Sequence, residues 1–241
     1  VGVFAIIIVL LRGGLHPFFS FNQLMLFLPM VILGATGTIC TFKGMKLIEA
    51  SEHTILLTSS KLWFIAGTLL FLREAFSLQK IIGAVTILAG VTIAQWRKGK
   101  FVFNAGAVYV LLAALFYASA DILSFFILRN FDAISLIAYS CVSIVVALII
   151  IRPGTIQKLS FYKKPKRAIN IVIVSINDTL ASLFVFTAYQ VGQNALQIGP
   201  LGATQTIVTV LLALVILRET DNMPQKIIGA VTTVIGTILL L

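Results

Sequence analysis

The chain has 241 residues, of which 59% are hydrophobic and only 11% charged, and its mean hydropathy is +1.07. Soluble globular domains carry about 25% charged residues, so this composition excludes an ordinary water-soluble domain. The net charge of +10 does not indicate a nucleic-acid-binding protein, because the 18 basic residues are scattered between apolar spans. Basic residues in such positions orient a membrane protein and contact anionic lipid head groups.

Nine apolar spans follow one another along the chain, and most approach the roughly 20 residues that a helix needs to cross a bilayer. They cover about 1–11, 24–48, 52–72, 78–96, 103–128, 132–151, 168–190, 194–218 and 224–241. Inside lipid only helices and closed barrels pair all their backbone groups. The spans are apolar on all sides and lack the alternation of barrel strands. The sequence therefore predicts an all-α, polytopic transmembrane helix bundle.

The sequence repeats itself. The octapeptide at 79–86 is identical to that at 225–232, and each follows a span that ends in Leu-Arg-Glu, at Glu74 and at Glu219. Each octapeptide contains a glycine that is followed by a second glycine seven residues later. Chance similarity would explain shared apolar runs, but not the shared polar residues at nearly equal separations. The repeat therefore indicates an internal duplication.

Five spans separate Glu74 from Glu219, and this odd number predicts two copies inserted with opposite orientation. Such inverted repeats are typical of secondary transporters. The offset of about 145 residues aligns 132–151 with the short span 1–11 and leaves 103–128 without a partner. We therefore expect a unit of five helices, ten helices in the parent protein with about nine in this chain, and roughly 40 residues preceding Val1. The first repeat is predicted at 1–98 and the second at 103–241.

These features resemble the drug/metabolite transporter superfamily, in particular its EamA-type members with two five-helix repeats. The resemblance is carried by Glu74 and Glu219 and by the glutamine-to-glycine segments 79–83 and 225–229. The sequence departs from the family where a proline is usual, about thirteen residues before the glutamate. Lys61 and Thr206 occupy these two positions.

The resemblance implies a secondary transporter in the cell membrane that works by alternating access around a central cavity between the repeats. The expected substrate is a small metabolite, either amino acid-like, nucleotide-sugar-like or another polar or amphipathic solute. Proton coupling and a homodimer are further expectations. No cofactor is expected, and no phosphate-binding loop of the G-x-x-x-x-G-K-[ST] type occurs.

Two other functions compete with transport: a non-transporting scaffold or receptor, and a membrane-embedded enzyme acting on a lipid-linked substrate. Such an enzyme usually has Asp, Glu or His clustered at helix ends. Here eight acidic residues and two histidines are spread widely, so no enzymatic activity is expected. His16, His53, Glu49 and Glu52 suggest no metal site.

Three ionisable residues inside the spans are candidate substrate-binding residues: Lys61, Asp178 and Asp121. A charge in mid-membrane costs roughly 2.5–3.5 kcal/mol on insertion scales, which points to a function. Lys61 and one aspartate would line the cavity and bind a charged substrate or pass a proton. The alternative is a permanent ion pair that only fixes helix packing.

Two uncharged candidates complete the predicted site. Gln205 lies inside a span and could hydrogen-bond a substrate or join two helices. Trp63 could form part of the cavity wall or face lipid.

The orientation of the chain in the membrane stays open. The distribution of basic residues puts the C-terminus outside the cytoplasm, whereas the family resemblance implies both termini inside.

Overall fold

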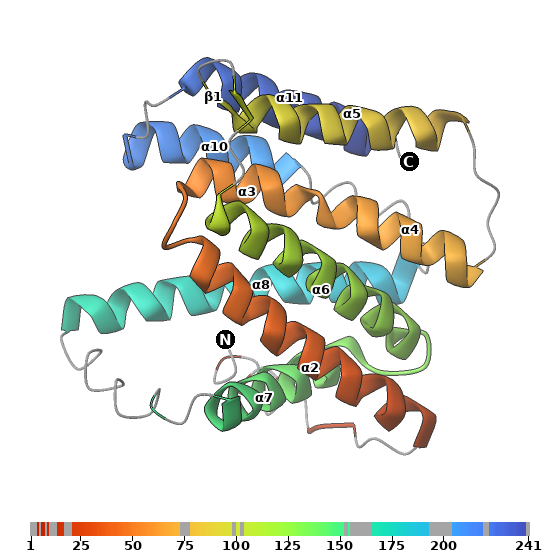
Figure 1. Ribbon diagram of the computed structural model, residues 1–241. Helices are drawn as coiled ribbons and strands as arrows, with labels where there is room; N and C mark the ends of the chain where they lie inside the picture. The colour runs from red at the N-terminus through yellow and green to blue at the C-terminus, as the bar shows by residue number, and fades with distance from the viewer. Residues whose placement is uncertain are drawn as a thin grey trace. The chain divides into compact units, whose positions relative to one another are not determined.

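The computed structural model describes residues 4, 6, 7, 9, 14–16, 21–72, 78–97, 100–101, 104–151, 154, 165–192, 204–218 and 222–239 (Figure 1). The helices are α2 (Phe21–Gly44), α3 (Ala50–Thr58), α4 (Ser60–Leu72), α5 (Leu78–Gln95), α6 (Ala105–Leu128), α7 (Ala133–Ile151), α8 (Pro165–Gly192), α10 (Thr204–Ile216) and α11 (Met223–Leu239). One short antiparallel hairpin joins β1 (Trp96–Arg97) to β2 (Lys100–Phe101). The predicted all-α helix bundle is therefore confirmed.

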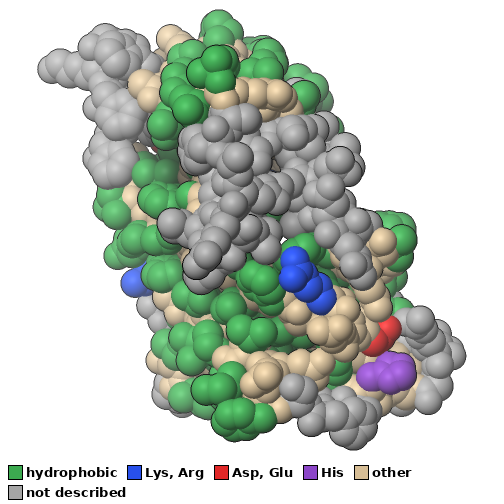
Figure 2. Space-filling view, turned by 90° about the vertical axis from the view of Figure 1, so that its right-hand side faces the viewer, with side chains coloured by type: hydrophobic (Ala, Val, Ile, Leu, Met, Phe, Trp, Pro, Cys, Tyr) green, Lys and Arg blue, Asp and Glu red, His purple; other side chains and the backbone are tan. Residues whose placement is uncertain are grey.

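Four of the described helices are long and apolar enough to cross a membrane: α2, α6, α7 and the Ala168–Val191 part of α8. Many of their outward-facing side chains are apolar too; Val174 and Phe184 of α8, for example, are largely exposed, although Asn177 and Asp178 of the same helix are exposed as well. Figure 2 shows hydrophobic side chains over much of the described surface on the face in view, with few charged ones among them. Exposed apolar surface on this scale is expected of helices that contact lipid.

The single predicted span 52–72 is divided into α3 and α4 at Ser59. The Ser59 amide donates to the carbonyl of Leu56, three residues back, at 3.1 Å, and the Leu62 amide donates to the Ser59 carbonyl at 3.0 Å. Bonds over three residues rather than four tighten the chain locally and interrupt the regular α-helix. The predicted span 194–218 is described only from Thr204 onward, as α10, and its earlier part lies outside the described residues.

The chain divides into two compact units. The first unit holds Val1–Ala35 with Leu123–Gln193, and the second unit holds Thr36–Ile122 with Asn194–Leu241. Helices α2 and α6 contribute residues to both units. The units cut across the predicted repeats 1–98 and 103–241, whose boundaries stay a prediction.

The first unit packs α7 against α8 around Ile137 and Ala138. The Tyr189 ring of α8 meets the Phe125 ring edge to face, with centroids 6.1 Å apart. Asp132 begins α7 as its N-cap, because its carboxylate accepts a hydrogen bond from the Ser135 amide at 2.9 Å.

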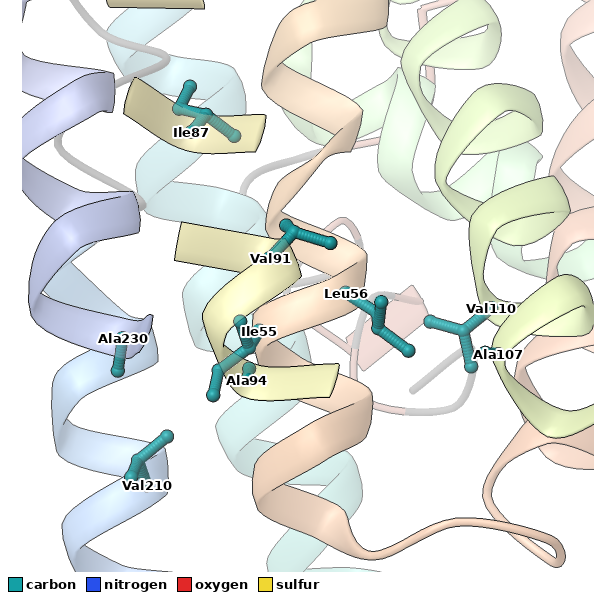
Figure 3. Packing of buried hydrophobic residues seen from close by; sticks show 9 residues of the cluster. All are labelled: Ile55, Leu56, Ile87, Val91, Ala94, Ala107, Val110, Val210 and Ala230. Carbon is teal, nitrogen blue, oxygen red and sulfur yellow. The ribbon is translucent and has the colours of Figure 1, made fainter. Parts of the chain in front are cut away.

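The core of the second unit surrounds α3, whose Ile55 and Leu56 are fully buried. Figure 3 shows Leu56 directed from α3 toward Val110 of α6. The other buried members of this core are Ile87, Val91, Ala94, Ala107, Val210 and Ala230. Helix α3 is thus enclosed by α5, α6, α10 and α11, which explains how so short a helix is held in place.

Helices α5 and α11 lie side by side and are joined through the repeated glycines (Figure 1). A Cβ atom on Gly236 would lie only 2.8 Å from the Gly83 carbonyl oxygen and 2.6 Å from the Ile87 amide nitrogen. Small residues permit this approach of two helix backbones. The contact belongs to the second unit and joins the two copies of the octapeptide.

Candidate functional site

A group of hydroxyl side chains joins α2 to α6 within the second unit. The Tyr117 hydroxyl of α6 donates to Thr38 Oγ1 at 3.3 Å and accepts from Thr41 Oγ1 at 3.2 Å. The two threonines are three residues apart, so they share one face of α2. Gly37 leaves room for the ring, since a Cβ there would lie 2.9 Å from Tyr117 Cε1. All three hydroxyl-bearing side chains are half-buried.

Asp121 follows Tyr117 by four residues and therefore lies on the same face of α6, one turn further on. Lys61 lies in the first turn of α4, and its charge acts on the Asp121 carboxyl group. Helix α4 reaches α6 closely at Gly67, which faces the Ile122 side chain. Lys61 and Asp121 therefore both belong to the second unit, near enough for their charges to interact, and both side chains are half-buried.

The other predicted site residues are not part of this group. Trp63 is on α4 and largely exposed. Asp178 is on α8 in the first unit, where its side chain is exposed. Gln205 lies in α10, but its side chain is outside the described structure. Glu74 and Glu219 also fall outside the described residues.

Further polar groups mark the junction of α3 with α4. The Thr58 hydroxyl donates to the Thr54 carbonyl at 2.9 Å and lies 2.8 Å from the Thr206 hydroxyl of α10. The Ser59 hydroxyl is buried and has no hydrogen-bond partner within the part of the chain that the structure describes. A buried hydroxyl without a partner costs about 1–3 kcal/mol, which a purely structural helix would avoid.

A second polar group, which we call the α3 cluster, consists of Glu49, Glu52, His53 and Lys226. Lys226 of α11 is 1% exposed and forms an ion pair with Glu49, the residue before α3. Glu52 and His53, in the first turn of α3, are also buried. Sequence reasoning considered three of these residues for a metal site and missed their association with Lys226. The sequence feature that could have revealed the cluster is the presence of three ionisable residues within positions 49–53, at the start of an apolar span.

A bundle whose helices are long and apolar enough to cross a bilayer defines an integral membrane protein. The sequence model of the EamA-like transporter family matches residues 104–241, which is more than half of the chain. The chain belongs to this family, part of the drug/metabolite transporter superfamily, and is by that membership a membrane transporter. The resemblance predicted from the repeated motifs is thus confirmed.

Solved structures support the fold. Nine chains of known structure match. One of them, described only as "Crystal structure of protein", is 16% identical in sequence and superimposes with a TM-score of 0.65. The match covers 99% of this chain and 82% of that chain. At this level of identity the similarity speaks for the fold alone. A comparison with curated proteins gave no match.

Proposed function

We propose that the protein is a secondary transporter that moves a small polar or amphipathic metabolite by alternating access between its two inverted repeats. The observation that carries the proposal is the proximity of Lys61 and Asp121 inside otherwise apolar helices of a transporter-family member. Keeping two charges there costs roughly 2.5–3.5 kcal/mol each on insertion scales. A permanent ion pair would gain little over apolar packing, so a role in binding is the better account of both residues.

The chemistry around this pair favours a zwitterionic solute such as an amino acid. Lys61 would receive a carboxylate, Asp121 would receive an ammonium group, and Tyr117 would offer a hydroxyl. Both charged groups are half-buried rather than sealed in the core, as binding requires. The interrupted helix at Ser59, two residues before Lys61, supplies irregular backbone of the kind found at transporter binding sites. Asp178, Gln205 and Trp63 are retained as secondary candidates for contact with the solute.

We assign the protein to the cell membrane as a multi-pass protein that moves its solute without ATP. A homodimer through the last helix of each repeat is not part of the proposal, because the glycines of α5 and α11 already pack against each other.

The test is transport by purified protein in liposomes. Vesicles preloaded with an unlabelled amino acid should accumulate the labelled one by exchange, and protein-free vesicles should not. Chemical conversion of the labelled solute would instead identify an enzyme. Absence of both exchange and conversion across amino acids, nucleotide sugars and sugar phosphates would favour the scaffold or receptor alternative.

A further inference from the structure

Several helix ends of the second unit meet at one side of it. The end of α2, the starts of α3, α6 and α11, and the hairpin after α5 all lie there (Figure 1). The Lys226–Glu49 ion pair ties the start of α11 to the start of α3. A Cβ atom on Gly44, the last residue of α2, would lie 3.3 Å from the Gly106 carbonyl oxygen at the start of α6. We call this side of the second unit the basic end.

Basic residues are concentrated in the sequence of the basic end. The segments that join helices there, 43–49, 96–104 and 217–226, contain seven basic residues, whereas the segment 73–80, which joins α4 to α5 at the opposite end, contains two. Short connecting segments rich in lysine and arginine stay on the cytoplasmic side of a membrane. They are attracted there by the anionic lipids of the cytoplasmic leaflet.

The turn between α2 and α3 combines basic residues with exposed apolar ones. Phe42, Met45 and Leu47 are 62%, 49% and 54% exposed, and Lys46 is exposed among them. The turn is nevertheless held in place, because Gly44 at its start packs closely against α6. Apolar side chains fixed outside the core, beside the end of a membrane-spanning helix, indicate contact with lipid.

Lys43 is positioned by an aromatic ring of α6. Its Nζ atom lies 5.0 Å from the centroid of the Tyr109 ring, within the range of a cation–π interaction. Lys43 is also in the last turn of α2, where the helix dipole favours a positive charge. Tyrosine is enriched where a bilayer meets water. The Tyr109 ring therefore fixes one positive charge at the depth of the lipid head groups.

We propose that the turn between α2 and α3 binds an anionic phospholipid of the cytoplasmic leaflet. Lys43 and Lys46 bind its phosphate, and the exposed Phe42, Met45 and Leu47 contact the apolar region below it. A free phosphate ion would satisfy the lysines but leave these three apolar side chains in water, so a phospholipid is the better match.

This assignment also orients the protein. The basic end lies at the cytoplasmic face, and α11 begins there at Met223 and crosses to the other side, so that Leu239 lies toward the outer face. The inference holds whether or not the protein transports a solute.

The first test is a lipid titration of the purified protein in detergent. Phosphatidylglycerol should raise the melting temperature more than phosphatidylcholine does, because a ligand of the folded state stabilises it. The double variant Lys43→Ala with Lys46→Ala should bind phosphatidylglycerol about 30-fold more weakly, as expected for two lysines that contribute about 1 kcal/mol each. The matched control, Arg73→Ala with Lys80→Ala, removes two basic residues from the opposite end and should bind like the wild type.

The comparison between lipids is made within each variant, so that any effect of a substitution on the fold itself cancels. An undiminished preference for phosphatidylglycerol in the Lys43→Ala, Lys46→Ala protein overturns the site. Inorganic phosphate should not raise the melting temperature. If it reproduces the effect of the lipid, the turn binds a free anion and the lipid assignment is wrong.

The second test locates the basic end by cysteine labelling in cells. Both native cysteines are replaced by serine, Cys40→Ser and Cys141→Ser, and one exposed position is then changed to cysteine. Met223→Cys probes the basic end, and Gln79→Cys, at the start of α5, probes the opposite end. A membrane-impermeant maleimide should label Gln79→Cys in intact cells and Met223→Cys only after the cells are opened. Labelling in the reverse order overturns the assignment to the cytoplasmic leaflet.

Discussion

Gly90 of α5 and Gly229 of α11 face each other without room for a side chain on either. A Cβ atom on Gly90 would lie 2.7 Å from the Gly229 carbonyl oxygen, and one on Gly229 would lie 2.8 Å from the Gly90 carbonyl oxygen. At the other end of the contact, a Cβ atom on Gly236 would lie 2.8 Å from the Gly83 carbonyl oxygen. The first glycine of each copy thus meets the second glycine of the other, which is the exchange that an inverted repeat produces.

This contact predicts a clear effect of adding one methyl group. Gly90→Ala should destabilise the protein by about 1–3 kcal/mol, because the added Cβ meets the Thr233 hydroxyl and also two backbone atoms, the Gly229 carbonyl oxygen and the Thr233 amide nitrogen, that cannot turn aside. This loss of stability opposes the gain of roughly 1 kcal/mol that alanine brings as a better helix former than glycine. Thermal unfolding in detergent measures it. Gly154→Ala is the control, since nothing lies within 4 Å of its added Cβ atom. Equal melting temperatures for Gly90→Ala and the wild type would contradict the close contact.

The positions of the helices could be predicted from the sequence because they depend on local composition. The relation between α5 and α11 could be predicted because the two helices contain the same octapeptide. Apolar runs fix where helices can cross lipid, and glycines seven residues apart lie on one helix face, where they permit a close helix contact. The interruption at Ser59 was not predictable, because no proline or glycine marks it. Its neighbours make contacts that only the folded chain brings together, including the bond between Thr58 and Thr206.

The candidate site was predicted in part. Lys61 stood out because a charge in an apolar span is rare, but the sequence could not choose between two aspartates. The choice depends on the crossing of α4 and α6, where Gly67 faces Ile122, and this favours Asp121. The Lys226–Glu49 pair joins residues 177 positions apart. Neither residue has a local signal that names its partner.

Breaking the Lys226–Glu49 pair should have unequal effects from its two sides. Lys226 is 1% exposed and Glu49 is 32% exposed. Glu49→Gln would leave a fully buried ammonium without its counter-charge, and such a loss typically costs about 3–5 kcal/mol. Lys226→Met would leave a carboxylate that water can still reach, so its cost should be smaller. The melting temperatures of the two single variants show the difference in their stability, and comparison with the double variant gives the coupling between the two residues.

The ranking of these variants is the decisive result. We expect the double variant, Glu49→Gln with Lys226→Met, to be more stable than Glu49→Gln alone, because no buried charge is left uncompensated. A double variant whose loss equals the sum of the single losses would mean that the two groups do not interact.

Lys61→Ala should weaken ligand binding while leaving the fold intact. A ligand at one hundred times its Kd stabilises the protein by about 2.7 kcal/mol, which raises the melting temperature measurably. Losing a charged hydrogen bond of about 1.5–3 kcal/mol should weaken binding roughly 10- to 150-fold. A thermal-shift screen with amino acids, nucleotides, sugar phosphates and lipophilic cations provides the reading. Lys46→Ala is the matched control, because Lys46 follows α2 and is exposed. An undiminished shift in Lys61→Ala would exclude Lys61 from the binding site.

The hydroxyl pair between α3 and α10 gives a last prediction, which concerns the interrupted helix. Thr58 donates to the Thr54 carbonyl, so the bond between the two hydroxyls is donated by Thr206. Thr58→Val removes the acceptor and leaves the buried Thr206 hydroxyl without this partner, at a cost of about 1–3 kcal/mol. Thr206→Val leaves the bond from Thr58 to Thr54 in place and should cost less.

Replacing both threonines removes the stranded hydroxyl and keeps the shape of the side chains. The double variant should therefore recover most of what Thr58→Val alone loses, since apolar replacement of both partners can be nearly neutral. Thermal unfolding in detergent distinguishes this recovery from a double variant whose loss of stability is the sum of the two single losses. If the double variant is less stable than Thr58→Val, the two hydroxyls contribute separately, and their contact does not hold α10 against the end of α3.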